Sequence, residues 1–574
     1  MPASASGAGR RRRRAVDPPA PGMPGGDPRI AFLGGVGEVG RNMAALEMEG
    51  RILVLDAGLS FPEAEMPGID LVLPDFGYLL DRADRIEAIV LTHGHEDHVG
   101  SVPYLLRELR LPIYATRLTL ALLEGKLDEH GVRDHAEYHE VTPGEEVTVG
   151  PFAMRFYRVT HSIPDGCAVA VDLPAGVLLH TGDFKLDPTP IDGRVTDLQG
   201  IAAEARKGVH VLLSDSTNAE DPGVTGSERT VGPVLYDIIR DAPRLAVVAC
   251  FASHIHRVQQ ICDAAIRSGR RVAFLGRSMH QSVRAAREHG YLTVPDGAVV
   301  PIEELERMDP SEVVVCSTGS QGEPLSALSL MAAREHKWVK LVPEDTVVLS
   351  SSPIPGNEAA IHRVVDGLYR TGARVFHVPM APVHVSGHAA AEELKTFLNL
   401  VRPRWFVPVH GERRHLQNHA RLACEVGIPS ERIFVVEDGD TVELGEVPRL
   451  GERVSAGMTF VDGIGIGDVG EVVLRDRRKL AEDGIVIVVV TVDGRTGEVL
   501  AGPDLVNRGF VYEETAGDIF EEAAHRTLTS LKESAAEQVA DPTVLKQHIR
   551  RAVGKYFFEV TKRKPVIVPV VMEV

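Results

Sequence analysis

The sequence predicts an α/β protein built from several domains. At 574 residues the chain exceeds the roughly 250 to 300 residues at which one hydrophobic core stops growing, so about two to four domains are expected. Short apolar segments separated by turn residues predict buried strands, and amphipathic segments between them predict helices. In the middle of the chain strands and helices alternate regularly, which predicts a separate parallel α/β unit.

The first part of the chain, residues 29–225, carries closely spaced strand signals. Strands are expected at 29–33, 43–48, 51–56, 86–91, 152–159, 168–173 and 177–180. A helix is expected at 101–110, where one face would carry Val102, Leu105, Leu106 and Leu109.

The middle unit is expected at 226–376, with strands at 245–250, 271–275 and 312–316 and a helix from Ile255. Histidine-rich motifs of the earlier type return after Val378, so this unit is predicted to be an insertion into the first domain, which would resume at 377–450. After a Gly-rich linker at 451–465, a small α/β module is expected at 466–574. It would contain a strand at 485–492, two helices and a final apolar strand at 565–574, and the second helix would bury Leu545, Ile549, Val553 and Phe557.

Composition narrows the classes of function. The net charge of −19 argues against a general basic nucleic-acid surface, so a nucleic-acid function must rest on a local site. No apolar run approaches the roughly 20 residues of a membrane helix. Residues 1–28 contain an arginine run but lack the apolar segment of a signal peptide, and a disordered basic tail is expected there. Five scattered cysteines predict neither disulfides nor a thiolate metal site, which favours the cytoplasm.

Gly35, Gly37 and Gly40 match the GxGxxG spacing of dinucleotide-binding loops, and Asp56 follows at a fitting distance. The context does not fit that site. Gly50 interrupts residues 41–56, which therefore predict a hairpin and leave no room for the roughly 10-residue helix that a pyrophosphate site needs. The glycines are instead expected to shape a tight loop beside the active site.

A metal site is predicted directly after the expected strand at 86–91. The sequence there is Thr92-His93-Gly94-His95-Glu96-Asp97-His98. Three imidazoles and a carboxylate in so short a run suit Zn²⁺ or Mn²⁺, whereas a solvated polar loop has no reason to concentrate them. With this HxHxDH pattern the sequence resembles the metallo-β-lactamase superfamily.

The resemblance implies two divalent metal ions, with Zn²⁺ preferred and Mn²⁺ or Mg²⁺ as alternatives. Asp183 would bridge the two ions, and Asp56 would orient a ligand histidine through a hydrogen bond. The implied ligands are His93, His95, Asp97, His98, His161, Asp183 and His410.

A second polar cluster follows the middle unit. Two short motifs each come after an apolar segment: Val383-His384-Val385-Ser386-Gly387-His388-Ala389 and Val409-His410-Gly411-Glu412. Two imidazoles, a hydroxyl and a glycine amide could form a phosphate cradle, while a plain polar turn is the alternative interpretation. For His410 the alternative is an ordinary core histidine. The residues expected to bind substrate are His384, Val385, Ser386, Gly387 and His388.

The order HxHxDH, HVSGH and HGE resembles the β-CASP nucleases, and within them the ribonuclease J family, from about residue 29 onward. Residues 214–218 (SDSTN), where Asp215 matches the family's acidic motif, strengthen the likeness, as do 317–324 (STGSQGEP) and 350–357 (SSSPIPGN). The likeness implies a metallo-β-lactamase αββα sandwich at 29–225 and 377–450. It also implies an inserted β-CASP α/β domain at 226–376 and a small C-terminal α/β oligomerisation domain at 466–574.

The likeness further implies the activity. The protein would be a cytoplasmic two-metal ribonuclease of RNA maturation and decay that degrades RNA from a 5′ monophosphate and also cuts internally. Asp97 would hold or deprotonate the attacking water, and His388 would contact the scissile phosphate and assist the departing 3′ oxygen. The C-terminal domain would form homodimers or homotetramers, and other RNA-decay proteins are possible partners. No membrane partner is expected.

Three other functions stay open at this stage. A DNA nuclease is disfavoured by His410, because DNA-acting relatives generally carry an apolar residue there. A small-molecule metallohydrolase such as a lactonase is disfavoured by the inserted unit and by HVSGH. A catalytically idle RNA-binding subunit would usually have lost metal ligands, and all seven candidates are present.

Overall fold

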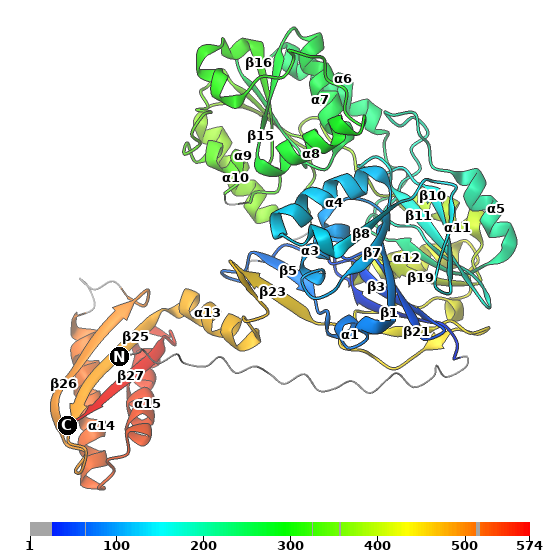
Figure 1. Cartoon of the computed structure of the whole chain (residues 1–574). Coiled ribbons are helices and arrows are strands. Elements are labelled where there is room, and N and C mark those ends of the chain that lie inside the picture. Colours follow the sequence, from blue (N-terminus) through cyan, green and yellow to red (C-terminus); the bar gives the residue numbers. More distant parts are fainter. Residues whose placement is uncertain (1–25, 64, 324, 355–356, 512–516) are drawn as a thin grey trace, which may run out of the picture. The chain divides into compact units, whose positions relative to one another are not determined.

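The computed structural model describes residues 26–574, except 64, 324, 355–356 and 512–516 (Figure 1). The predicted basic tail therefore lies almost wholly outside the described residues. The chain forms two compact units, of which the first contains Leu73–Met458 and the segment up to Ser60, and the second contains Phe61–Val72 and Thr459–Val574. None of the helices in the described part is long and apolar enough to cross a membrane.

Two β-sheets form the core of the first unit. Across the larger sheet the strands are β22 (Arg449–Leu450), β21 (Thr441–Glu443), β1 (Arg29–Gly34), β3 (Met43–Met48), β4 (Arg51–Leu55), β6 (Ile86–Val90), β7 (Leu111–Ala115) and β8 (Ala136–Glu140). Across the smaller sheet they are β19 (Trp405–Val409), β13 (Val209–Asp215), β12 (Gly176–His180), β11 (Cys167–Leu173), β10 (Phe152–Arg158) and β9 (Glu146–Val149). Leu46 and Leu53 of the first sheet share one buried cluster with Phe156 and Val169 of the second, so the two sheets pack face to face.

The direction of the strands brings the carboxyl ends of several of them to one edge of this sandwich. In the smaller sheet β12, β13 and β19 run parallel, and β10 has the same direction because both β10 and β12 are antiparallel to β11. In the larger sheet β4 and β6 are parallel. Since the carboxyl ends of parallel strands meet at one edge, the residues that follow these strands can form a common site.

Helices cover the outer faces of the sandwich. On the smaller sheet, Leu394 and Phe397 pack in one buried cluster with Leu212, and the helices involved are α5 (Leu198–Gly208), α11 (Ala391–Val401) and α12 (Arg413–Glu425). On the larger sheet, α4 (Arg117–His130) packs beside β8 and the short helix α3 (Val102–Leu105). The helix expected at 101–110 is thus shorter than predicted, because the chain turns after Leu105 to enter β7.

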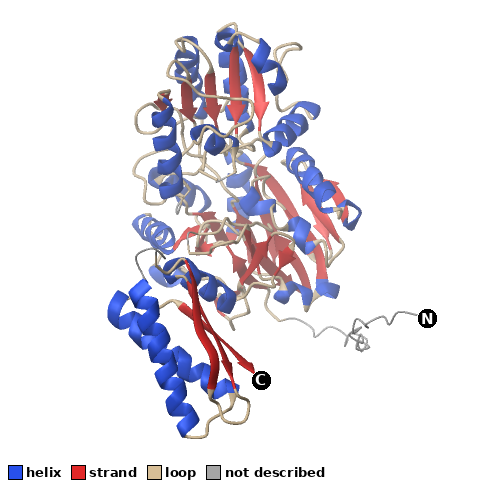
Figure 2. Ribbon diagram, turned by 90° about the vertical axis from the view of Figure 1, so that its left-hand side faces the viewer, coloured by secondary structure: helices blue, strands red, loops and turns tan. Residues whose placement is uncertain are grey.

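The inserted domain has a five-stranded parallel sheet that lies between helices (Figure 2). Its strands, in order, are β15 (Arg271–Leu275), β16 (Val313–Ser317), β14 (Ala246–Ala249), β17 (Thr346–Leu349) and β18 (Arg374–Phe376). Alternate residues face opposite sides: Val314 packs with α6 (Val231–Arg240), α7 (Ile255–Arg267) and α8 (Arg277–Glu288), while Val315 packs with α9 (Ala327–Ala332) and α10 (Glu358–Thr371). The predicted α/β insertion is confirmed.

The second unit ends in a three-stranded sheet backed by two long helices. The strands are β26 (Val499–Arg508), β25 (Ile485–Val492) and β27 (Val566–Glu573), and the helices are α14 (Gly517–Ala536) and α15 (Pro542–Thr561). The predicted face of α15, from Leu545 to Phe557, is buried against alternate residues of β25. The sequence prediction missed β26, because Gly502-Pro503-Asp504 interrupts its apolar pattern; an edge strand tolerates such a proline.

The start of the second unit contains a segment that sequence reasoning placed entirely in the first domain. Ile69 and Val72 pack with Phe460, Val469 and Leu474. The elements here are β5 (Leu71–Pro74), β23 (Met458–Asp462), β24 (Gly465–Ile466) and α13 (Glu471–Asp483). Arg477 of α13 donates to the backbone oxygens of Pro67 and Gly68 at 3.3 and 3.1 Å.

Candidate metal centre

Three histidines and an aspartate converge at the edge where the sandwich strands end. His93 and His95 follow β6, His161 follows β10 and Asp183 follows β12. His95 Nδ1 lies 3.1 Å from both His93 Nε2 and His161 Nε2, and Asp183 Oδ2 lies 3.7 and 3.8 Å from the same two nitrogens. A tetrahedral ion with bonds of about 2.0 to 2.1 Å separates its ligand atoms by roughly 3.3 to 3.4 Å, so this spacing fits one metal ion.

A second group of four shares Asp183 and adds Asp97, His98 and His410. His98 Nε2 lies 3.2 Å from Asp183 Oδ2 and 3.6 Å from Asp97 Oδ2, while His410 Nε2 lies 3.4 Å from Asp97 Oδ2. His410 Nε2 is buried and has no hydrogen-bond partner among the described residues. A buried polar atom of this kind needs a partner, and a divalent cation would supply it.

The charges differ on the two sides of Asp183. Burial opposes protonation of His410, but Asp183 and Asp97 outweigh it and raise the pKa of this imidazole to about 10. Against the same effect of burial, Asp183, Asp97 and Asp56 hold the pKa of His98 well above its usual value. On the other side, burial lowers the pKa of His95 to about 4. Neutral imidazoles can ligate a metal directly, whereas His98 and His410 must lose protons when a metal binds.

Asp56 and Asn42 hold the second group in place. Asp56 follows β4 and accepts hydrogen bonds from Thr92 N at 2.7 Å and Thr92 Oγ1 at 2.9 Å, and its Oδ2 lies 2.8 Å from His98 Nδ1. The orienting contact expected of Asp56 is therefore present in the geometry. Asn42 was not singled out from the sequence, yet its Nδ2 lies 3.1 Å from His98 Nε2 and donates to Asp97 O at 3.1 Å.

The HVSGH loop lies directly beside this centre. The ring of His388 is 4.9 Å from that of His161, and its Nδ1 is 2.8 Å from Asp215 Oδ2 and 4.0 Å from Asp183 Oδ2. Although burial opposes it, Asp215 raises the pKa of His388 above its usual value. A protonated imidazole here could donate to phosphate oxygen or to a leaving group.

The backbone carbonyl oxygens in the second half of the loop, at Ser386, Gly387 and His388, are occupied by donors from the protein. Gly387 O lies 2.8 Å from His161 Nδ1, and His388 O accepts from Asn218 and Thr225. In contrast, the amides of His384, Val385, Ser386 and Gly387 have no acceptor within the part of the chain that the structure describes. Consecutive free amides form a site for an oxyanion. His384 Nδ1 lies 3.4 Å from Arg257 Nη1 of the inserted domain, and Val385 packs against an apolar cluster that contains helices of that domain.

The glycine-rich loop at 34–40 supports His410. Its strand β2 (Val36–Gly37) pairs with β20 (Gly411–Glu412), and His410 N donates to Gly35 O at 3.0 Å. β3 and β4 form the expected hairpin. The predicted hairpin is confirmed, and the glycines form a tight loop next to His410.

Four family models match the chain: "Ribonuclease J, beta-CASP domain" at 244–368, "Ribonuclease J C-terminal domain" at 472–574, "Metallo-beta-lactamase superfamily" at 36–219 and "Zn-dependent metallo-hydrolase RNA specificity domain" at 379–435. Ribonuclease J of Mycobacterium tuberculosis H37Rv is 47% identical over 97% of this chain and 100% of its own length. The chain belongs to the ribonuclease J family. The resemblance drawn from the motifs is confirmed, as is the predicted combination of a metallo-β-lactamase fold with β-CASP and C-terminal domains.

Other members of the ribonuclease J family match over similar lengths. Ribonuclease J 1 of Streptococcus pyogenes serotype M3 is 42% identical over 95% of this chain and 97% of its own. Ribonuclease J2 of Bacillus subtilis 168 is 42% identical over 95% of this chain and 98% of its own length. Among solved structures, a protein of unknown function from Enterococcus faecalis V583 matches with a TM-score of 0.51 and 15% identity over 72% of this chain and 99% of that chain, and shows the fold alone.

Gly58 of this ribonuclease J family member lies directly against the backbone of Asp97 in the candidate centre. A Cβ at Gly58 would lie 1.6 Å from the backbone oxygen of Asp97, which cannot swing aside. We expect Gly58→Ala to displace Asp97 and His98 and to weaken metal affinity by about 10- to 100-fold. Metal titration followed by calorimetry measures this.

The control is Gly125→Ala in α4, where nothing lies within 4 Å of the added Cβ. Equal metal affinity in both variants would show that the Gly58 contact does not shape the centre.

Proposed function

We propose that this chain is a metal-dependent ribonuclease that hydrolyses RNA phosphodiesters with two divalent ions. The observation that carries the proposal is the pair of four-residue ligand groups that share Asp183, next to a loop whose free amides can bind phosphate. His93, His95 and His161 would hold one ion, and Asp97, His98 and His410 the other. Nitrogen and carboxylate donors at this spacing suit Zn²⁺, with Mn²⁺ or Mg²⁺ as alternatives.

When bound, the metal ions supply Lewis-acid chemistry that activates water and neutralises phosphate charge. Asp97 is the more exposed of the two carboxylates in the ligand set, with 29% of its side chain accessible, so water can reach it. We infer that Asp97 holds the attacking water or takes its proton. His388 Nε2 can donate a hydrogen bond to the scissile phosphate or a proton to the departing 3′ oxygen, because Asp215 holds the opposite ring nitrogen.

The same loop supports attack from a 5′ end. Ser386 and Gly387 would hold the 5′ monophosphate through their amides, with the scissile phosphate at His388 and the metal ions. We infer 5′-to-3′ exonuclease action with additional internal cleavage, in RNA maturation and decay. The sandwich at 29–225 and 377–450 would carry the chemistry, and the domain at 226–376 would help to enclose the RNA.

Digestion of RNA and DNA oligonucleotides of the same sequence, each with a 5′ monophosphate, tests the substrate class. We expect mononucleotides from RNA alone with added Zn²⁺ or Mn²⁺. Hydrolysis of the DNA at an equal rate would replace the proposal with a general nuclease. If both strands stayed intact and a lactone were opened, the small-molecule alternative would hold.

We also propose that the C-terminal domain joins subunits into a homodimer or homotetramer. On the face of β25 away from α14 and α15, Ile487 and Val489 are only partly buried and pair with Val568 and Val570 of β27. In the described part of this domain no helix covers that face (Figure 1). An apolar sheet face of this kind is typical of a subunit interface.

We expect the intact protein to sediment as a dimer or tetramer and Val489→Asp to sediment as a monomer, because the new charge would be buried without a partner. Val195→Asp is the control, since Val195 is 48% exposed in the first unit. A monomeric wild type, or a Val489 variant with the wild-type mass, would contradict this interface.

The setting we propose is the cytoplasm, with other RNA-decay proteins as partners. All five cysteines are free, and four of them are buried. A reducing compartment is compatible with this cysteine usage.

A further inference from the structure

Arg257 of α7 links the two places where the chain crosses between the sandwich and the inserted domain. The first crossing contains Gly226 and Glu228, and the second contains the HVSGH loop. The Arg257 side chain is wholly buried. A buried guanidinium is stable only when its donors are satisfied, so its partners define what it holds in place.

Both sides of the guanidinium are occupied. Toward the first crossing, Nε and Nη2 donate to the two carboxylate oxygens of Glu228 at 2.6 and 2.8 Å. Toward the second, Nη1 donates to Val383 O at 3.0 Å and lies 3.4 Å from His384 Nδ1. Nη1 also donates to Ser350 Oγ at 2.6 Å, and Ser350 Oγ in turn donates to Val383 O at 2.7 Å. The carbonyl at the start of the HVSGH loop is thus held from two directions.

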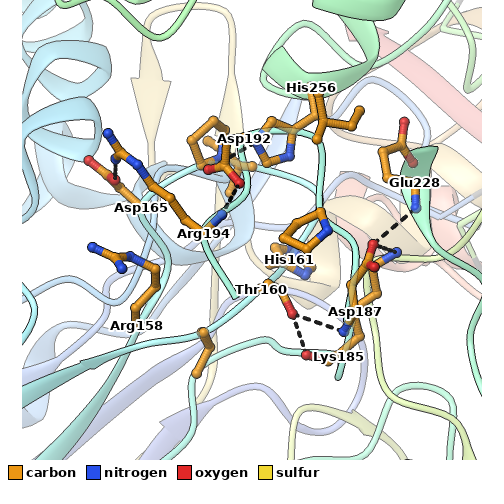
Figure 3. A pocket seen from close by; sticks show the side chains of 15 residues that line it. Arg158, Thr160, His161, Asp165, Lys185, Asp187, Asp192, Arg194, Glu228 and His256 are labelled. Atoms are coloured by element: carbon orange, nitrogen blue, oxygen red, sulfur yellow. Dashed lines mark hydrogen bonds and ion pairs between the residues drawn. The ribbon is translucent and has the colours of Figure 1, made fainter. Parts of the chain in front are cut away.

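Lys185, a residue of the sandwich, also contacts both crossings. Its ammonium is buried and donates to Gly226 O of the first crossing at 3.0 Å and to Ser386 O of the loop at 3.1 Å. Asp187 beside it accepts from Glu228 N at 3.1 Å. Figure 3 shows Lys185, Asp187 and Glu228 together beside His161. Two buried cations therefore hold the carbonyls of Val383, just before the loop, and Ser386, in its middle.

We infer that Arg257, through its pair with Glu228, is a positioning residue that sets the HVSGH loop for phosphate binding. A peptide group that turns its oxygen toward the protein interior directs the amide of the next residue the other way. For the held carbonyls of Val383 and Ser386 these are the amides of His384 and Gly387, the first and last of the four consecutive amides without acceptors in the described chain. The inference rests on the proposed function. It predicts that substitution of Arg257 lowers activity on substrates that bind the loop and leaves the metal centre unchanged.

The test compares Arg257→Lys with wild type on two substrates. Lysine keeps the charge but cannot span Glu228 and Val383 with a planar fork. With 5′-monophosphorylated RNA we expect kcat/KM to fall by about 100-fold. With bis(p-nitrophenyl) phosphate, whose leaving group needs no acid and which has no 5′ phosphate, the rate should stay within about threefold, and bound metal should be unchanged.

Arg155→Lys is the matched control. Arg155 is also buried and also donates through Nε and Nη2 to a buried carboxylate, Glu204, but it has no contact with the loop. We expect it to lower the melting temperature while leaving the ratio of the two activities as in wild type. Glu228→Gln provides a second variant, which should lower RNA hydrolysis selectively even if Arg257→Lys does not fold.

An equal loss on both substrates, or loss of metal, would overturn the positioning role, as would unchanged RNA kinetics. Failure of the proposed function is distinguishable from failure of this inference. In the first case the wild-type protein itself would leave the RNA uncut, while wild type and Arg257→Lys could still be compared on bis(p-nitrophenyl) phosphate.

Discussion

Replacing Asp183 with asparagine is expected to reduce RNA hydrolysis by about 10³-fold or more and to remove bound metal. Asp183 belongs to each of the three groups of four possible metal ligands found among the described residues, and its oxygens lie 3.2 Å from His98 Nε2 and 2.7 Å from His410 Nδ1. Loss of its charge removes several kcal/mol of electrostatic stabilisation, and about 1.4 kcal/mol corresponds to a factor of ten in rate. Metal analysis of the purified variant and single-turnover RNA cleavage measure the two effects.

The control for this substitution is Asp345→Asn. Asp345 is equally buried and pairs with Arg244 at 2.6 Å, but it lies in the inserted domain away from the metal ligands. We expect this variant to keep its metal and its catalytic rate while losing stability. Full activity of Asp183→Asn would mean that the centre described above does not carry the chemistry.

His388→Gln is expected to lower kcat by about 10²- to 10⁴-fold while the metal content stays at the wild-type level. The reason is that His388 acts on the phosphate and the leaving group, whereas the seven proposed ligands remain in place. For phosphodiesters with an activated aryl leaving group, the rate of hydrolysis should fall much less, because that leaving group departs without a proton.

Loss of metal from His388→Gln would instead identify His388 as a ligand, since His388 forms a further group of four possible ligands with Asp183, Asp215 and His410. His419→Gln is the matched control. His419 is buried against Ser216 Oγ at 3.0 Å and contacts no proposed ligand directly.

Much of the candidate centre was predictable because its proposed ligands come in short motifs at strand ends. HxHxDH concentrates four proposed ligands in six residues, and strand order then brings His161, Asp183 and His410 to the same edge. Asn42 and Gly58 escaped prediction, because a single asparagine or glycine near a strand has many possible roles. Only the folded chain shows that Asn42 touches His98 and that Gly58 lies against Asp97.

Long-range contacts were harder to predict, because single residues distant in the sequence carry no local pattern that links them. Arg257 lies 126 residues from Val383 in the chain, and no local pattern marks a buried arginine as a partner of that loop. The strand β26 carries glycine and proline that a strand pattern normally excludes, and its place at a sheet edge is a tertiary property. Residues 61–72 join the second unit through Ile69 and Val72, which look like any other apolar residues in the sequence.

The most direct test of the account is digestion of one RNA oligonucleotide that carries a 5′ monophosphate, a 5′ triphosphate or a 5′ hydroxyl, by wild type and by His95→Ala with added Zn²⁺ or Mn²⁺. The account predicts mononucleotides chiefly from the monophosphate form and none with the variant, which lacks a nitrogen from the first ligand group. Three intact RNAs under every metal condition would contradict it.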